Sequence, residues 1–443
     1  MMLKDFSPPI VTDMAEKLEK DFTLAKMTQA ELDEVIRKHA MFMTGKRGGA
    51  RAIVKDRDLS GLFLMGQNLS QSDFTGCILA NADLTDANFE GATLFGCDFT
   101  NAQMNNARMV RADLRGADVS KADLSKANMT GADLREGKTI INRKPRKDAD
   151  TFGKTESHPA QLAGSNLAHA NLAGATATSA NFSGANMQDA NMQGANLKGA
   201  NLQGVDLSRA DLSAADIRNA DLSYATMVGA NLRGSEKSGA DFTLTLTGEA
   251  VGKDFAEVPL TLDELLLRHT AWVASGGRNG RQLDLSGTDM RKGPALSARK
   301  LTSMKAPQST FAEMDLRGVE MQAAHLERSD FRKCLLQNSD LRGSNFTGAL
   351  LQRANLSKAN LNSLYFKKPD GVAYSIPCNF EKASLRQAIL AGAAITEGRF
   401  QQADLAQADF SNCDLRQADF TGADLTETNF DGAALDGAIF DKK

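Results

Sequence analysis

The 443-residue chain is long enough for two or three ordinary domains, and its 42% hydrophobic content excludes an intrinsically disordered protein. Only 6% of the residues are aromatic, which argues against a nucleic-acid interface built on stacked rings. With 52 basic and 55 acidic residues the net charge is −3, which excludes a strongly basic nucleic-acid binder, so we expect no direct nucleic-acid binding.

The N-terminal residues lack the apolar run of a signal peptide, and no apolar stretch of about 18 residues occurs anywhere. We therefore expect a cytoplasmic protein without a membrane span. A helix is predicted near residues 11–26, and a second helix follows it. Thr28 and Glu31 have the spacing of a capping box, and Gly45 suits the C-terminal stop. Residues 1–56 are thus predicted to form a helical cap.

From Leu59 to Leu134 an apolar residue recurs at every fifth position. A helix cannot keep a five-residue period on one face, because five residues rotate by about 500°. In an extended segment, residues two apart point to the same side. A small residue, mostly Ala, stands two places before each apolar residue. The pattern therefore predicts that both point inward, that the intervening Asp or Asn points outward, and that the next two residues form a corner.

Later blocks repeat this pattern over residues 162–242, 311–366 and 380–440. A second period appears in the last block, where four phenylalanines lie twenty residues apart: Phe380, Phe400, Phe420 and Phe440. Four five-residue sides per turn is the simplest interpretation.

The interruption at residues 243–282 resembles the start of the chain. Leu32 through His39 align with Leu262 through His269, and an Asp-Leu-Ser-Gly segment follows each, at 58–61 and 284–287. We therefore predict a duplicated chain with a helical cap before each solenoid, because an open coil end exposes unpaired strand edges. Residues 291–310 are predicted to form a degenerate coil with a one-residue bulge.

These five-residue repeats resemble those of the pentapeptide-repeat family, whose pattern is A(D/N)LXX. Residues 122–126, 195–199 and 423–427 match this pattern in full. The resemblance implies an all-β fold, a right-handed, four-sided (quadrilateral) parallel β-helix. The prediction is two tandem solenoid modules with short α-helical caps. The predicted domains are a cap at 1–56, a β-helix at 57–242 with a loop insertion at 135–160, an internal cap at 243–282, and a β-helix at 283–443 with a loop insertion at 367–377.

Neither the cysteines nor the histidines have the spacing of a metal or catalytic site. All five cysteines occupy the small inward position, so we interpret them as substitutes for Ala, and their odd number does not suggest a disulfide framework. His39 and His269 are equivalent cap positions, which favours a packing role. No phosphate-binding loop or hydrolase motif is found. We expect no catalytic residue, no metal and no cofactor.

Two charged segments are candidate binding surfaces. A basic loop at Arg143, Lys144, Arg146 and Lys147 could contact nucleic acid or an acidic partner, but a solvated loop explains it better. The last block carries eleven acidic and six basic residues over 379–443. Its candidate acidic face consists of Asp404, Asp409, Asp414, Asp419 and Asp424. The alternative explanation is that Asp is simply the commonest residue at the outward position of the repeat.

Some members of the family resemble DNA and bind type II topoisomerases such as gyrase. A DNA mimic about 70 Å long would need about 40 negative charges, which a net charge of −3 does not supply. Only the acidic C-terminal coils could therefore act as a local DNA mimic.

The final coil ends in apolar residues and a short charged tail. We expect an end-to-end homodimer through Phe420, Phe430, Leu435 and Phe440, although the tail could also cover this edge.

The sequence therefore favours a non-catalytic scaffold that binds a protein partner of unknown identity. One alternative is a topoisomerase modulator that acts through the acidic C-terminal coils. The other is an enzyme of unknown type, for which the sequence offers no set of catalytic residues.

Overall fold

The computed structural model describes residues 24–140, 155–367 and 371–441. Each five-residue repeat forms one side of a coil. Ala82 and Leu84, two residues apart, are both fully buried. The side chain of Asp83, between them, points away from the core and accepts a hydrogen bond from the Thr85 N–H at 3.0 Å. Asp86 then turns the corner with a positive φ of 58°, a conformation that Gly, Asn and Asp adopt most readily.

Parallel bridges join residues twenty positions apart, and four of them recur in each coil. One coil of the first solenoid bridges to the next through Asp58–Ile78, Phe63–Asp83, Asn68–Asn88 and Asp73–Thr93. The sides are single bridges rather than long strands, because each extended stretch is interrupted by the next turn. The predicted four-sided parallel solenoid with a twenty-residue coil is confirmed in this geometry.

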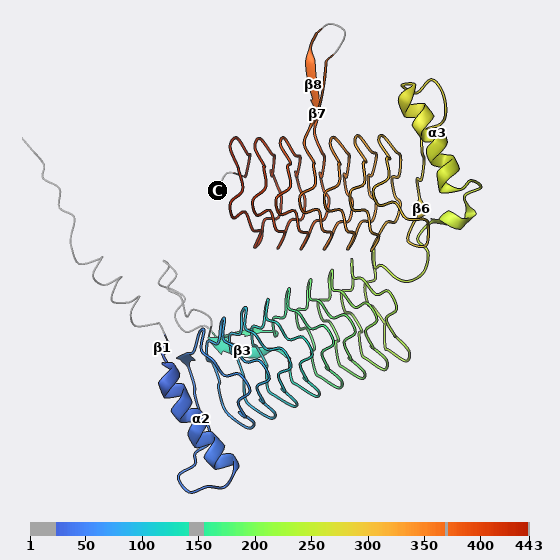
Figure 1. Cartoon of the computed structure of the whole chain (residues 1–443). Helices are drawn as coiled ribbons and strands as arrows, with labels where there is room; N and C mark the ends of the chain where they lie inside the picture. The colour runs from blue at the N-terminus through green and yellow to red at the C-terminus, as the bar shows by residue number, and fades with distance from the viewer. Residues whose placement is uncertain (1–23, 141–154, 368–370, 442–443) are drawn as a thin grey trace, which may run out of the picture. The chain divides into compact units, whose positions relative to one another are not determined.

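The chain divides into two compact units, Met1–Gly248 (unit 1) and Glu249–Lys443 (unit 2). Each unit has a separate hydrophobic core made of stacked inward rows. Figure 1 shows that in each unit a helix precedes a ladder of coils.

The cap of unit 1 consists of strand β1 (Ala25–Lys26) and helix α2 (Gln29–Met43). β1 pairs in parallel with β2 (Arg57–Asp58) in the first coil. The predicted capping box is present: Thr28 accepts from the Glu31 N–H, and Glu31 accepts from the Thr28 N–H. The helix predicted near residues 11–26 is wrong at its end, where residues 25–26 form β1, and otherwise lies outside the described residues.

The cap of unit 2 has the same order with one addition. Strand β5 (Lys253–Asp254) pairs in parallel with β6 (Thr288–Asp289). The short 3-10 helix η2 (Phe255–Glu257) follows, and then helix α3 (Leu262–Ala274) with its own capping box at Thr261 and Glu264. Six residues separate β5 from the N-cap of α3, whereas only Met27 separates β1 from the N-cap of α2.

The duplication holds, but the alignment of its coils must be corrected. The Ala52 N–H donates to Nδ1 of His39, and the Leu283 N–H donates to Nδ1 of His269. These equivalent bonds match residue 52 with 283, so β2 matches β6. The two Asp-Leu-Ser-Gly segments therefore lie on different sides of the coil. Identical repeats disguise such a five-residue shift, because every side has the same sequence pattern.

The predicted irregular coil of unit 2 is confirmed. Asp284 bridges Lys305 and Asp289 bridges Thr310, each 21 residues apart, whereas Lys300 bridges Glu320 at the usual spacing.

Both insertions that the sequence predicts as loops emerge as β-hairpins. β3 (Gly137–Ile140) pairs antiparallel with β4 (Thr155–His158) in unit 1. β7 (Leu364–Lys367) pairs antiparallel with β8 (Ala373–Ile376) in unit 2. Figure 1 shows the β7–β8 hairpin standing off the coils of unit 2.

Candidate interaction surfaces

Most outward carboxylates are held by the turn that follows them. Asp98 accepts hydrogen bonds from the backbone N–H of Thr100 at 2.9 Å and from its hydroxyl at 2.6 Å. The same arrangement at Asp211 and Ser213 lowers the pKa of the Asp211 carboxyl, chiefly through the side-chain hydrogen bond. These aspartates have a structural role in the turn, as expected for Asx-turns.

Many of these carboxylates also form an ion pair with an arginine two residues later. Arg218 contacts both oxygens of Asp216, at 2.8 and 2.6 Å, and this contact lowers the pKa of Asp216 to about 2. The pairs with this two-residue spacing are Asp113–Arg115, Asp133–Arg135, Asp216–Arg218, Asp289–Arg291, Asp315–Arg317, Asp330–Arg332, Asp340–Arg342 and Asp414–Arg416. Exposed pairs of this kind add little stability, but they remove local charge from the surface.

The predicted acidic face is distributed around the coil. Asp404 and Asp424 are bridged to each other and lie on one side, whereas the bridges of Asp409, Asp414 and Asp419 belong to the three other sides. A five-residue step moves the chain to the next side, so consecutive repeats cannot share a face. Arg416 pairs with Asp414, and Arg386 lies 3.1 Å from Asp404 and 3.8 Å from Asp424. The described coils therefore present no continuous acidic face from these five residues.

The predicted basic loop, Arg143, Lys144, Arg146 and Lys147, lies outside the described residues. The hairpin β3–β4 leads into it and out of it. Its role as a binding surface stays a prediction.

The predicted dimer contact lies in the last described coils of unit 2. Phe420 is buried, and the Phe440 ring stacks on it with centroids 5.0 Å apart. Phe430 and Leu435 are half-buried, whereas 39% of Phe440 is exposed. The described coils thus show apolar side chains at this end, and the end-to-end contact stays a prediction.

The β7–β8 hairpin is an exposed apolar surface that sequence reasoning missed. Cross-strand pairing places Phe366 opposite Tyr374 and Leu364 opposite Ile376. Because side chains alternate along a strand, these four lie on one face. Phe366, Tyr374 and Ile376 are 41%, 43% and 37% exposed, and the two rings stack 5.4 Å apart.

The opposite face of the hairpin is anchored to the solenoid. Glu397 accepts hydrogen bonds from the Tyr365 hydroxyl at 2.8 Å and from the Ser363 hydroxyl at 2.7 Å. These bonds fix the base of the hairpin. The Tyr365 ring is still 65% exposed on this face, and Phe366, Tyr374 and Ile376 are exposed on the other. The five-residue period predicts Phe366 as an inward residue of the repeat and residues 367–377 as a loop. The prediction for Phe366 is wrong, because the chain leaves the coil at β7 and this ring is 41% exposed.

The cysteines behave as inward small residues. All five are buried and free of disulfides. Cys97 donates through its thiol to the Phe74 carbonyl at 2.9 Å, and Cys413 donates to the Leu390 carbonyl at 3.0 Å. Burial raises the pKa of Cys413 to about 11, and the pKa of Cys334 rises for the same reason. Such thiols stay protonated and are poor nucleophiles.

The two buried histidines fasten the caps to the coils. Nε2 of His39 lies 3.1 Å from the carbonyl oxygen of Ser70, while its Nδ1 accepts from Ala52 in the first coil. Both histidines stack on an aromatic ring three residues later, Phe42 or Trp272. Burial lowers the pKa of both imidazoles. This arrangement explains why the two positions match.

In the described parts of the chain, no group of three His, Cys, Asp or Glu side chains is arranged to hold a metal ion. Within the same residues, neither the length nor the hydropathy of any helix suffices to cross a membrane.

The model of the pentapeptide-repeat family matches six stretches of the chain: residues 64–101, 97–135, 160–194, 195–234, 329–363 and 403–441. A search of the curated proteins finds no match. Because the matches fall in both units, the repeat extends across the duplication.

Several solved structures resemble the chain. QnrB1, described as a plasmid-mediated fluoroquinolone resistance protein, is 20% identical over 43% of this chain and 91% of its own, with a TM-score of 0.22. HetL is a pentapeptide repeat protein involved in heterocyst differentiation regulation in the cyanobacterium Nostoc sp. It is 18% identical over 89% of this chain and 94% of its own, with a TM-score of 0.17. A pentapeptide repeat protein from the thylakoid lumen of Arabidopsis thaliana is 27% identical over 32% of this chain and 68% of its own, with a TM-score of 0.21.

Proposed function

The chain belongs to the pentapeptide-repeat family, and from this premise we propose that it is a non-catalytic scaffold that binds a protein partner through the β7–β8 hairpin. We also infer that both solenoids wind as right-handed quadrilateral β-helices, as the family resemblance implies.

The exposed apolar face of the hairpin is the observation that carries this proposal. A soluble surface rarely keeps several neighbouring apolar side chains exposed on one face without a use for them. Phe366, Tyr374 and Ile376 form such a face, and Glu397 holds the base of the hairpin against the coil. A rigid base and an open aromatic face suit an apolar groove on a partner protein, because Tyr and Phe are frequent interface anchors.

The test compares two variants that add one charge each to opposite faces of β8. Tyr374→Asp places a carboxylate on the apolar face, and Ala373→Asp places one on the other face. Proteins bound by the wild-type chain in extracts of its native cells are identified by quantitative mass spectrometry, and binding is then measured with the purified partner. We expect Tyr374→Asp to weaken binding by about tenfold or more and Ala373→Asp to leave it nearly unchanged. A partner that binds both variants equally would contradict the proposal.

The alternative of a topoisomerase modulator finds less support in the geometry. Its acidic residues lie on four sides of the coil, and Arg416 and Arg386 contact three of them. A supercoiling assay with purified gyrase tests it directly, because inhibition or protection at micromolar protein would restore this candidate. For an enzymatic role, we find no supporting arrangement in the described residues.

A further inference from the structure

The two caps differ at the point where strand and helix join. In unit 1, α2 starts directly beyond β1, and the Gln29 side chain closes the gap to the first coil with two hydrogen bonds to the Phe63 backbone at 2.9 Å. In unit 2, the helix begins three residues later relative to its histidine, and residues 255–260 are inserted before it. The insertion holds the chain away from the coil and leaves space beneath it.

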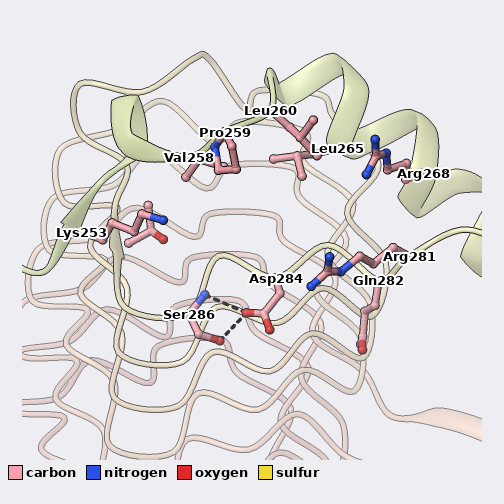
Figure 2. A pocket seen from close by; sticks show the side chains of 11 residues that line it. Lys253, Val258, Pro259, Leu260, Leu265, Arg268, Arg281, Gln282, Asp284 and Ser286 are labelled. Atoms are coloured by element: carbon pink, nitrogen blue, oxygen red, sulfur yellow. Dashed lines mark hydrogen bonds between the residues drawn. The ribbon is translucent and has the colours of Figure 1, made fainter.

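This space is a pocket of about 280 Å³. Val258, Pro259, Leu260 and Leu265 line it along one side (Figure 2). Figure 2 shows Gln282, Asp284 and Ser286 of the first coil facing this apolar side. The other polar lining residues are Lys253 of β5, Arg268 of α3, Arg281 and Thr288, with the two arginines at one end and Lys253 at the other.

The three cations of this pocket have no ion-pair partner within 4 Å among the described residues, in contrast to the arginines held two residues after an aspartate. Arg268 lies four residues after Glu264, but that carboxylate accepts from Thr261 in the capping box. In unit 1 the capping glutamate is Glu31, so Glu34 is free to pair with Lys38 at 3.3 Å. The hydrogen bonds from Thr261 chiefly lower the pKa of Glu264 and the charge of Arg268 adds to this, but Arg268 forms no ion pair with this carboxylate within 4 Å.

The single carboxylate of the pocket is also engaged elsewhere. Asp284 accepts from the N–H and the hydroxyl of Ser286, at 3.0 and 2.5 Å. Burial alone would raise the pKa of Asp284, but the hydrogen bonds from Ser286 lower it, and the charges of Lys305 and Arg281 add smaller contributions. Asp284 and Arg281 form no ion pair within 4 Å. Three positive charges against one negative charge leave the lining net positive. Cations that converge on a concave, partly apolar surface favour an anion there.

We propose that this cap pocket of unit 2 binds a small organic anion, a phosphate or carboxylate with a short apolar group. The guanidinium groups of Arg268 and Arg281 bind the oxyanion, because planar arginine forks match phosphate and carboxylate oxygens. The apolar group of the ligand packs against Leu260 and Leu265. The volume lies at the lower end of known ligand pockets, which limits the ligand to a small molecule.

Unit 1 serves as an internal comparison, because it has the same cap without the pocket lining. By the alignment of Ala52 with Leu283, the counterpart of Arg281 is Ala50 and that of Asp284 is Ile53. The backbone bond from residue 281 to the Arg268 carbonyl has its equivalent from Ala50 to Lys38. The shared backbone therefore fixes the cap. The cation at Arg268 corresponds to Lys38, whereas Arg281 has no charged counterpart in unit 1.

The test uses phenyl phosphate and inorganic phosphate as probes in isothermal titration calorimetry with the full-length protein. We expect phenyl phosphate to bind one site saturably, and more tightly than inorganic phosphate because the ring packs on the leucines. The double variant Arg268→Ala with Arg281→Ala is expected to lose about tenfold or more in affinity. Arg317→Ala, which removes an arginine already paired with Asp315, is the matched control and should bind like the wild type.

Each outcome decides the proposal. Absence of saturable binding of phenyl phosphate, or an unchanged affinity in the double variant, overturns the site. Equal affinity for phenyl phosphate and inorganic phosphate overturns the proposal that the apolar group of the ligand packs against the leucines. Both arginine side chains are exposed, so the cap should remain folded; equal thermal midpoints establish this. The charge-reversing variant Arg281→Glu gives a second measure and should abolish binding.

Discussion

At the residue scale, the small inward position sets the width of the solenoid. Ala195 is 1% exposed, and its neighbours one coil away on either side, Ala175 and Ala215, are equally buried. Coils bonded to each other lie about 4.8 Å apart, so this row leaves no room for a branched side chain. The low aromatic content follows from the same geometry, because one of the two inward sites is mostly occupied by Ala, Ser or Cys, with Val as at Val205 and Val319.

Ala195→Leu should therefore destabilise unit 1 by roughly 1–3 kcal/mol, because three added carbon atoms overpack the row of alanines. Urea unfolding followed by circular dichroism measures the loss. Gln193→Leu, at an exposed corner position two residues earlier, adds a similar apolar side chain outside the core and should be nearly neutral. Equal stability of the two variants would contradict the inward assignment.

At the element scale, each cap is joined to its solenoid by one buried histidine. The imidazole of His39 must be neutral to accept a hydrogen bond at Nδ1 from Ala52 while Nε2–H donates to Ser70. The matching helices predict the position and a packing role. The partner of this histidine cannot be predicted from the sequence, because Ser70 lies 31 residues away in a coil that has the same sequence pattern as every other coil.

The histidine caps predict a stability that depends on pH. Burial lowers the pKa of His39 and His269 below the unfolded value of about 6.5, and the charge of Arg51 adds to this effect at His39. The folded protein thus binds fewer protons than the unfolded chain below that pH. The contribution is complete above about pH 6.5 and is lost as the pH falls, by up to about 1.4 kcal/mol per pH unit for each histidine.

Urea unfolding at pH 7.5 and pH 5.5 checks this sign for the wild type and for the double variant His39→Gln with His269→Gln. The wild type should lose more stability over this interval than the variant. The lowered pKa values of the carboxylates act below this range, so they do not produce the difference. Equal losses would show that neither imidazole is held neutral by the cap.

At the scale of the whole molecule, the repeat predicted the coils well and the interruptions poorly. The five-residue period determines the inward rows, because only one backbone arrangement buries both residues of each repeat. The pocket combines Lys253, Leu260 and Arg281, which belong to segments without a period and meet only through the pairing of β5 with β6. The apolar face of the hairpin likewise depends on the pairing of Phe366 with Tyr374.

The two separate cores predict that each unit folds without the other. No residue belongs to both clusters of buried side chains, and each cluster includes a leucine of its own cap helix, Leu32 or Leu262. Each unit also contains both strands of its entry pair, β1 with β2 and β5 with β6. Residues 1–248 and 249–443 expressed separately should each unfold cooperatively, at midpoints near those of two transitions in calorimetry of the intact chain. A fragment that stays unfolded alone, while its partner fragment restores its structure, would show that the cores depend on each other.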